Sequence, residues 1–262
     1  MSVFAPGLDE ITVTLEASVA IVTINRPAKL NSVTPEMSDV LERFAVWANG
    51  APGIRAIVLT GAGDRAFCAG SDIRTLDGYA TPWSFRNRRD YCDALRDVRK
   101  PVIAAVNGYA FGGGLETALT CDIRLAATTA SFAAPEVNLG WIGGGGMSAL
   151  LSASIGPGNA AMMLMTGDPI DAQRALAWGL VSEVLPAAGL LPRALELATT
   201  IAARPPIAVE TAKANLAAAA DMPRAAAMAY EREMQTITFA TRDAAEGRAA
   251  FAQKRSATFE GR

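Results

Sequence analysis

Two buried strands that each end in glycines, with a helix to follow, most restrict what this chain can fold into. Residues 54–60 form a predicted buried strand that ends at Gly61-Ala62-Gly63. Residues 101–106 form another, which ends at Asn107-Gly108 and continues to Gly112-Gly113-Gly114 and the start of a helix. Unbroken apolar runs are typical of strands buried on both faces, and strands that alternate with helices predict an α/β architecture.

The N-terminal quarter supports this prediction with a hairpin and a helix. Residues 11–15 and 19–25 are rich in β-branched side chains on either side of Ala17-Ser18, which predicts two antiparallel strands. Thr34 followed by Pro35-Glu36 predicts a helix start, because a threonine cap, a proline at the first position and an acidic first turn all favour one.

After residue 120 the strand and helix units repeat loosely. Residues 123–127 predict a short strand, and residues 162–165 predict the strand of a further unit that ends at Thr166-Gly167-Asp168. A helix over residues 172–178 and a strand over residues 180–185 follow.

From about Leu190 onward the strand patterns disappear and helical patterns take over. We therefore predict two parts, an α/β core over residues 1–190 and a helical module over residues 191–262. The helices of the second part are expected from Leu191, from Pro206, from Pro223 after a cap at Asp221, and over residues 243–254.

Composition excludes several classes of function. The net charge of −2 does not favour nucleic acid as a partner, and no apolar stretch is long enough to span a membrane. Three cysteines without a C-x-x-C pair predict no disulfide framework or metal site, and no signal peptide is visible, which favours a cytoplasmic location. The chain contains no histidine, so triads that use histidine are impossible, and acid–base work must come from groups such as carboxylates.

The two glycine turns allow three interpretations. Either turn alone is best explained by tight packing of a strand against a helix. A dinucleotide site is disfavoured, because Gly61-x-Gly63 lacks the third glycine and the later acidic residue, and this counts against an NAD-dependent oxidoreductase. A phosphate loop is excluded because no Gly-Lys-Ser/Thr follows. The pair together favours an oxyanion hole, in which each turn donates one backbone amide.

Four sequence stretches resemble the crotonase (enoyl-CoA hydratase/isomerase) family, and the match covers essentially the whole chain in order. They are AFCAGSDI at residues 66–73, KPVIAAVNGYAFGGGLE at 100–116, TGDPIDAQRALAWGLV at 166–181, and Asn25-Arg26-Pro27 with Leu30-Asn31. The resemblance implies a spiral of repeated β-β-α units closed by C-terminal helices that form trimers, often as a dimer of trimers.

The resemblance also implies a mechanism. It assigns the two thioester-binding amides to Ser71 and Gly113 and the acid–base pair to Glu116 and Glu136, which favours a 2-enoyl-CoA hydratase of fatty acid metabolism. An enoyl-CoA isomerase or another enolate-forming acyl-CoA enzyme is the alternative. Without the resemblance, Glu116 would be interpreted as an acidic residue in a first helical turn, and Glu136 as a solvated loop residue.

The same resemblance gives expectations about ligands. Coenzyme A is part of the substrate and no separate cofactor or metal is needed. Its contacts are expected at Ala69, Asp72, Ile73, Arg74 and Lys254. The chain departs from the family at GWIGGGGMSALL, residues 140–151, where Gly143 replaces a proline and Trp141 adds bulk. This departure leaves the acyl group and the final proton transfer open.

Overall fold

The computed structural model describes residues 4–262, and its framework is a large sheet in the strand order β1-β2-β3-β5-β7-β10. β1 pairs with β2 as the predicted antiparallel hairpin, and every other pair in this sheet is parallel. All residues of β3 and β5 are buried, as their unbroken apolar sequences predict. The strands are β1 (Ile11–Glu16), β2 (Val19–Ile24), β3 (Ala56–Gly61), β5 (Val102–Val106), β7 (Ile123–Ala127) and β10 (Glu183–Leu185).

A second, smaller sheet has the strand order β4-β6-β8-β9. Its strands β4 (Ala66–Cys68), β6 (Tyr109–Phe111) and β8 (Ser131–Ala133) are parallel, and β9 (Ile170–Asp171) is antiparallel to β8. Three times in succession the chain passes from a strand of the large sheet to a strand of the small sheet and then into helices: β3 then β4, β5 then β6, β7 then β8. The predicted spiral of β-β-α units is confirmed.

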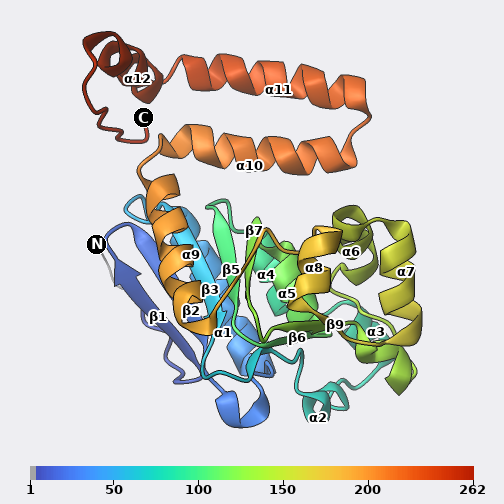
Figure 1. The fold of residues 1–262 in the computed structure, drawn as a ribbon. Helices are drawn as coiled ribbons and strands as arrows, with labels where there is room; N and C mark the ends of the chain where they lie inside the picture. Colours follow the sequence, from blue (N-terminus) through green and yellow to red (C-terminus); the bar gives the residue numbers. More distant parts are fainter. Residues whose placement is uncertain (1–3) are drawn as a thin grey trace.

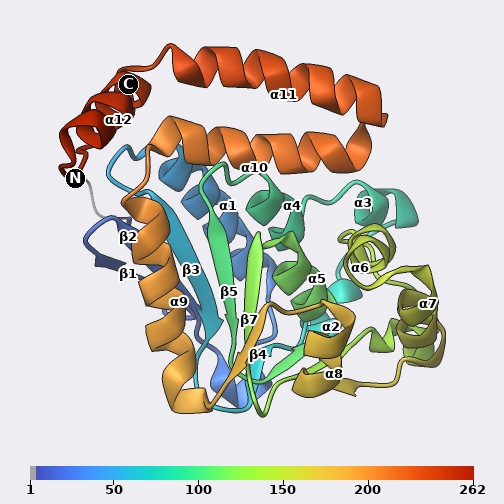
Figure 2. The same cartoon turned by 45° about the horizontal axis from the view of Figure 1, so that its top comes forward.

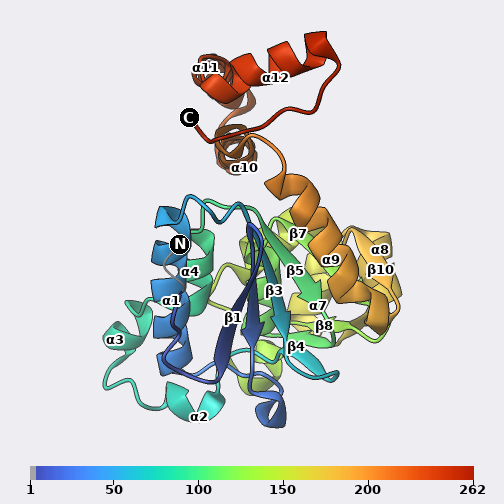
Figure 3. The same ribbon diagram turned by 90° about the vertical axis from the view of Figure 1, so that its left-hand side faces the viewer.

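Helices cover both faces of the large sheet, and Figures 2 and 3 show these layers. On one face lie α1 (Pro35–Gly50), which Thr34 caps as predicted, with α4 (Tyr91–Arg96) and α5 (Gly113–Thr120). On the other face α9 (Ala187–Ala202) packs Leu190, Ala194 and Ala198 against β3, β5 and β7. The remaining helices of the core are η1 (Pro27–Lys29), α2 (Ile73–Leu76), α3 (Pro82–Arg86), η2 (Pro135–Leu139), α6 (Met147–Ile155), α7 (Pro157–Thr166) and α8 (Ala172–Trp178).

The last three helices form an arm that stands off from the sheets (Figures 1 and 3). They are α10 (Pro206–Asp221), α11 (Arg224–Phe239) and α12 (Arg242–Gln253). Neither α10 nor α11 has a buried residue. Ion pairs connect α10 to the core, from Glu210 to Lys100 at 2.5 Å and from Lys213 to Asp122 at 2.8 Å. Among residues 4–262, no helix combines the length and the apolar character needed to cross a membrane.

Three local predictions were wrong or only partly right. Residues 162–165 belong to helix α7 instead of a strand. Asp221 ends α10 and does not cap α11, whose preceding residue is Pro223. The strand predicted over residues 180–185 is confined to its last three residues, β10. The boundary predicted after residue 190 falls inside α9, and the division into two parts stays a prediction.

Candidate active site

Three predicted site residues lie at equivalent places in consecutive repeats. Ser71 follows the end of β4 by three residues, Gly113 follows β6 by two, and Glu136 follows β8 by three. Because β4, β6 and β8 are parallel neighbours, their carboxyl ends meet at one edge of the small sheet. Ligands of parallel α/β sheets commonly bind outside such an edge.

The turns that carry Ser71 and Gly113 touch each other. Gly70 has a φ of +90°, and a Cβ added to it would lie 2.9 Å from the Gly113 nitrogen. Within residues 4–262, the backbone N–H groups of Ser71 and Gly113 donate no hydrogen bond. Gly113 is also the first residue of α5, where the helix dipole favours negative charge. Two unpaired amides on contacting turns are suited to bind one oxygen that gains charge.

A buried asparagine holds the first turn in place. Asn31 is fully buried, and its Nδ2 donates to the carbonyl oxygens of Ala66 at 2.6 Å and Ala62 at 3.0 Å. Its Oδ1 accepts from the backbone N–H of Arg26, at 2.9 Å, and the Arg26 guanidinium pairs with Asp72 at 2.8 Å. The Asn25-Arg-Pro and Leu30-Asn31 motif therefore supports the segment that presents the Ser71 amide.

Glu116, on α5, is held by the glycine run that departs from the family pattern. Its side chain is 5% exposed, and its Oε1 accepts from the backbone N–H groups of Gly145 at 2.6 Å and Met147 at 3.1 Å. A Cβ at Gly143 or Gly145 would lie 2.8 or 2.7 Å from a Glu116 carboxylate oxygen. The glycines thus let the backbone pack directly on this carboxylate.

Glu136, on η2, is the second buried carboxylate, at 9% exposure. Its Oε2 is buried and has no hydrogen-bond partner among the described residues. Its Oε1 lies 3.0 Å from where a Cβ of Gly112 would be, so it sits beside the second turn. Burial raises the pKa of Glu136. Burial also raises the pKa of Glu116, against the two amide hydrogen bonds, and the Glu136 charge raises it further.

The residues predicted to contact coenzyme A fall into two groups. Ala69, Asp72, Ile73 and Arg74 surround Ser71 in the chain. Ile73 and Arg74 are exposed, while Asp72 caps α2 and pairs with Arg26. Lys254 follows α12, in the arm, so the fold of a single chain does not bring it to the Ser71 turn (Figure 1). Their contacts with coenzyme A stay predictions.

Sequence reasoning missed one residue of the site, Tyr91. Its buried hydroxyl group lies 3.1 Å from the Ser71 hydroxyl oxygen. No local pattern points to this contact, since the two residues are 20 positions apart. In the segment that departs from the family pattern, Trp141 is exposed, as is Ile142.

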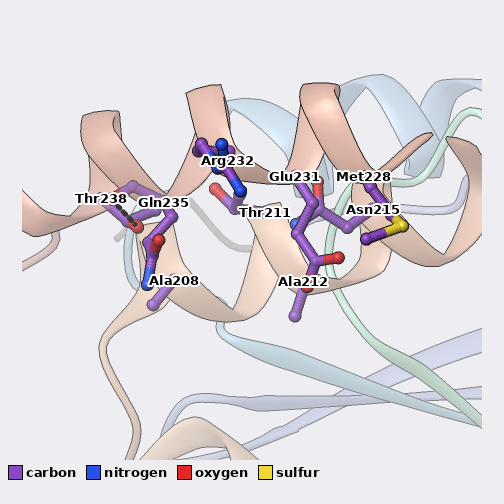
Figure 4. Close-up of a pocket in the computed structure, with 9 residues that line it drawn as sticks. All are labelled: Ala208, Thr211, Ala212, Asn215, Met228, Glu231, Arg232, Gln235 and Thr238. Atoms are coloured by element: carbon purple, nitrogen blue, oxygen red, sulfur yellow. Dashed lines mark hydrogen bonds between the residues drawn. The ribbon is translucent and has the colours of Figure 1, made fainter. Parts of the chain in front are cut away.

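Two cavities differ in their relation to the site. A cavity of about 260 Å³ reaches Ser71 and Tyr91 and is also lined by Arg88 and Thr75. Another, of about 390 Å³, lies between α10 and α11, and neither Glu116 nor Glu136 lines it (Figure 4). It is lined by Ala208, Thr211, Ala212, Asn215, Met228, Glu231, Arg232, Gln235 and Thr238. The first cavity therefore lies beside the candidate active site, and the second lies in the arm.

Buried carboxylates and unpaired amides together, on a parallel α/β spiral, are suited to proton transfer beside an oxygen that gains negative charge. A sequence model of the family "Enoyl-CoA hydratase/isomerase" matches residues 14–262. The mitochondrial enoyl-CoA hydratase of Pongo abelii is 40% identical over 93% of this chain and 84% of its own length. The (E)-benzylidenesuccinyl-CoA hydratase of Thauera aromatica is 38% identical over 95% of this chain and 99% of its own.

A solved structure gives the same result at the level of the fold. The enoyl-CoA hydratase of Bacillus anthracis superposes with a TM-score of 0.91 at 33% identity, over 97% of this chain and all of that one. The chain belongs to the crotonase, or enoyl-CoA hydratase/isomerase, family and is an enzyme of that family. The alternative that the chain is an NAD-dependent oxidoreductase is therefore rejected.

Proposed function

We propose that this enzyme hydrates the double bond of a 2-enoyl-CoA thioester, with Glu116 and Glu136 as its acid–base pair. The observation that carries the proposal is the placement of two buried carboxylates beside the unpaired amides of Ser71 and Gly113. Named relatives at 38–40% identity are hydratases of acyl-CoA substrates, which supports it.

In the proposed reaction the thioester oxygen accepts hydrogen bonds from the Ser71 and Gly113 amides. The water oxygen bonds to C3 and gives a proton to one carboxylate, while the C2=C3 electron pair moves toward the thioester and forms an enolate. The other carboxyl group then delivers a proton to C2. Exchange with solvent restores both groups.

The surroundings of the two glutamates support one distribution of these roles. Burial raises the pKa of Glu116, but its two amide hydrogen bonds stabilise the carboxylate against this effect, so it is suited to take the proton from water. Glu136 has an unpartnered oxygen and a pKa raised by burial, so it is suited to carry the proton that reaches C2. No metal, redox cofactor or separate coenzyme takes part in these steps.

Replacing Glu136 by Gln tests the proposal. Loss of one acid–base group should lower hydration of crotonyl-CoA at least a hundredfold and leave binding largely intact. The control is Glu16→Gln, which changes an exposed glutamate on β1. The assay should also include a longer enoyl-CoA and (E)-benzylidenesuccinyl-CoA, each monitored for hydration and for double-bond migration. Unchanged turnover in Glu136→Gln would contradict the proposal, and migration without hydration would identify an isomerase.

We also propose that the arm joins copies of this chain into a trimer or a dimer of trimers. α10 and α11 are each 16 residues long, yet neither buries a residue within the chain. Large apolar side chains are exposed on the arm, among them Leu216 on α10 (72%), Ile237 on α11 and Phe251 on α12 (87%). Exposed apolar surface of this kind favours a protein interface.

A further inference from the structure

The hydroxyl group of Tyr91 contacts both turns of the proposed oxyanion site. Tyr91 is the first residue of α4, its side chain is 5% exposed, and its hydroxyl oxygen lies 3.1 Å from Ser71 Oγ. A buried tyrosine hydroxyl normally has a hydrogen-bond partner, and within residues 4–262 Ser71 is the partner that the structure provides.

The same oxygen packs on Gly113. A Cβ added to Gly113 would lie 2.0 Å from the Tyr91 hydroxyl oxygen, and 3.2 Å from its ring carbon Cζ. The hydroxyl thus occupies the space beside the Gly113 Cα. One oxygen atom therefore touches the two residues whose amides are proposed to bind the thioester.

Capping and packing of α4 hold Tyr91 in place. Asp90 caps α4 by accepting from the backbone N–H groups of Cys92 and Asp93, and α4 packs on α1 and α5. Burial raises the pKa of Tyr91 well above its ordinary value of 10, so its hydroxyl keeps its proton throughout the working pH range. Asp90 is an acidic neighbour that acts in the same direction.

We propose that Tyr91 is a positioning residue, which sets the relative placement of the Ser71 and Gly113 amides by bonding to one residue and packing on the other. This inference rests on the proposed function, because it assigns those amides to the thioester oxygen. It predicts that loss of the Tyr91 hydroxyl weakens polarisation of the thioester more than it weakens binding.

A double-mutant cycle tests the positioning role. Tyr91→Phe and Ser71→Ala each remove one side of the hydrogen bond and keep both backbone amides. Each should lower kcat for crotonyl-CoA about tenfold and change KM less than threefold. The double variant should be no slower than either single variant, because both changes remove the same interaction.

A spectroscopic probe separates positioning from a structural role. Cinnamoyl-CoA absorbs at longer wavelength when its carbonyl is polarised, so the red shift on binding should be smaller in Tyr91→Phe than in the wild type. Tyr109→Phe is the control, since Tyr109 is partly exposed and its hydroxyl makes no hydrogen bond in the described part of the chain.

Each result has a defined meaning. Wild-type kcat and an unchanged red shift in Tyr91→Phe, or additive losses in the double variant, would overturn the positioning role while hydration by the wild type stands. A wild type that shifts the probe without hydrating any enoyl-CoA would refute the proposed function alone. A wild type that does neither would refute both.

Discussion

Replacing Gly113 by Ala should disable the enzyme through a collision that the structure locates. The new methyl group would lie 2.0 Å from the Tyr91 hydroxyl oxygen, far inside contact distance, so either the Tyr91 hydroxyl or the Gly113 backbone must shift. Either shift changes the contact between Tyr91 and the Gly113 turn and displaces the Gly113 amide from its place beside Ser71. Loss of one oxyanion donor typically costs about 10²–10³ in kcat, and we expect a decrease of this size.

The collision can be relieved, which makes the reasoning testable. In Gly113→Ala/Tyr91→Phe the nearest atom becomes the ring carbon at 3.2 Å, a tight but tolerable contact. Steady-state hydration of crotonyl-CoA by the double variant should therefore be faster than by Gly113→Ala, and close to that of Tyr91→Phe. Gly158→Ala, at a glycine with no atom within 4 Å of the new Cβ, is the control. A double variant no faster than Gly113→Ala would refute the argument, provided that circular dichroism shows both variants folded.

Three further predictions follow from the glutamates and the arm. Gly145→Ala puts a methyl group 2.7 Å from Glu116 Oε2, which should displace the carboxylate from its amide donors. We expect kcat to fall about 10–100-fold, and turnover at the wild-type rate would contradict this expectation. Because burial raises the pKa of Glu136, the folded state binds its proton more tightly than the unfolded chain does, and its ionised form destabilises the fold. Glu136→Gln should therefore raise Tm at pH 8. The gain should shrink as pH falls through the raised folded pKa toward the ordinary glutamate value of 4.5, and below 4.5 no gain is expected; a lower Tm at pH 8 would contradict the argument. Leu216→Asp should reduce the molar mass measured by light scattering toward that of one chain, and an unchanged mass would exclude α10 from the interface.

Sequence predicted the fold best where local rules and burial agree. The hairpin, the Thr34 cap of α1 and the buried strands β3 and β5 each combine a local signal with an apolar pattern. The strand predicted over residues 162–165 was wrong because a short apolar run fits a strand and a buried helix equally well. The helix cap predicted at Asp221 was wrong because a polar residue between two helices can end the first as readily as it can cap the second.

The candidate site was predictable only in its contiguous segments. Ser71, Gly113, Glu116 and Glu136 lie in or next to recognisable motifs, and the fold brings them together. The hydrogen bonds from Gly145 and Met147 to Glu116 span about 30 residues, and the contact between Ser71 and Tyr91 spans 20. Such contacts depend on how the repeats stack, and no spacing along the chain encodes them.

The spacing of strands in the small sheet also limits the separation of the Ser71 and Gly113 amides. Ser71 and Gly113 follow adjacent strands, β4 and β6, and adjacent strands lie about 4.8 Å apart. Two N–H donors that share one oxygen at about 2.9 Å can be at most about 5.8 Å apart, so one strand spacing fits and two do not. Sheet geometry therefore brings the proposed amide pair within the required span, and contacts such as that of Tyr91 adjust how the two amides are placed within it. We expect side-chain changes around it to alter the aim of the amides more readily than their separation.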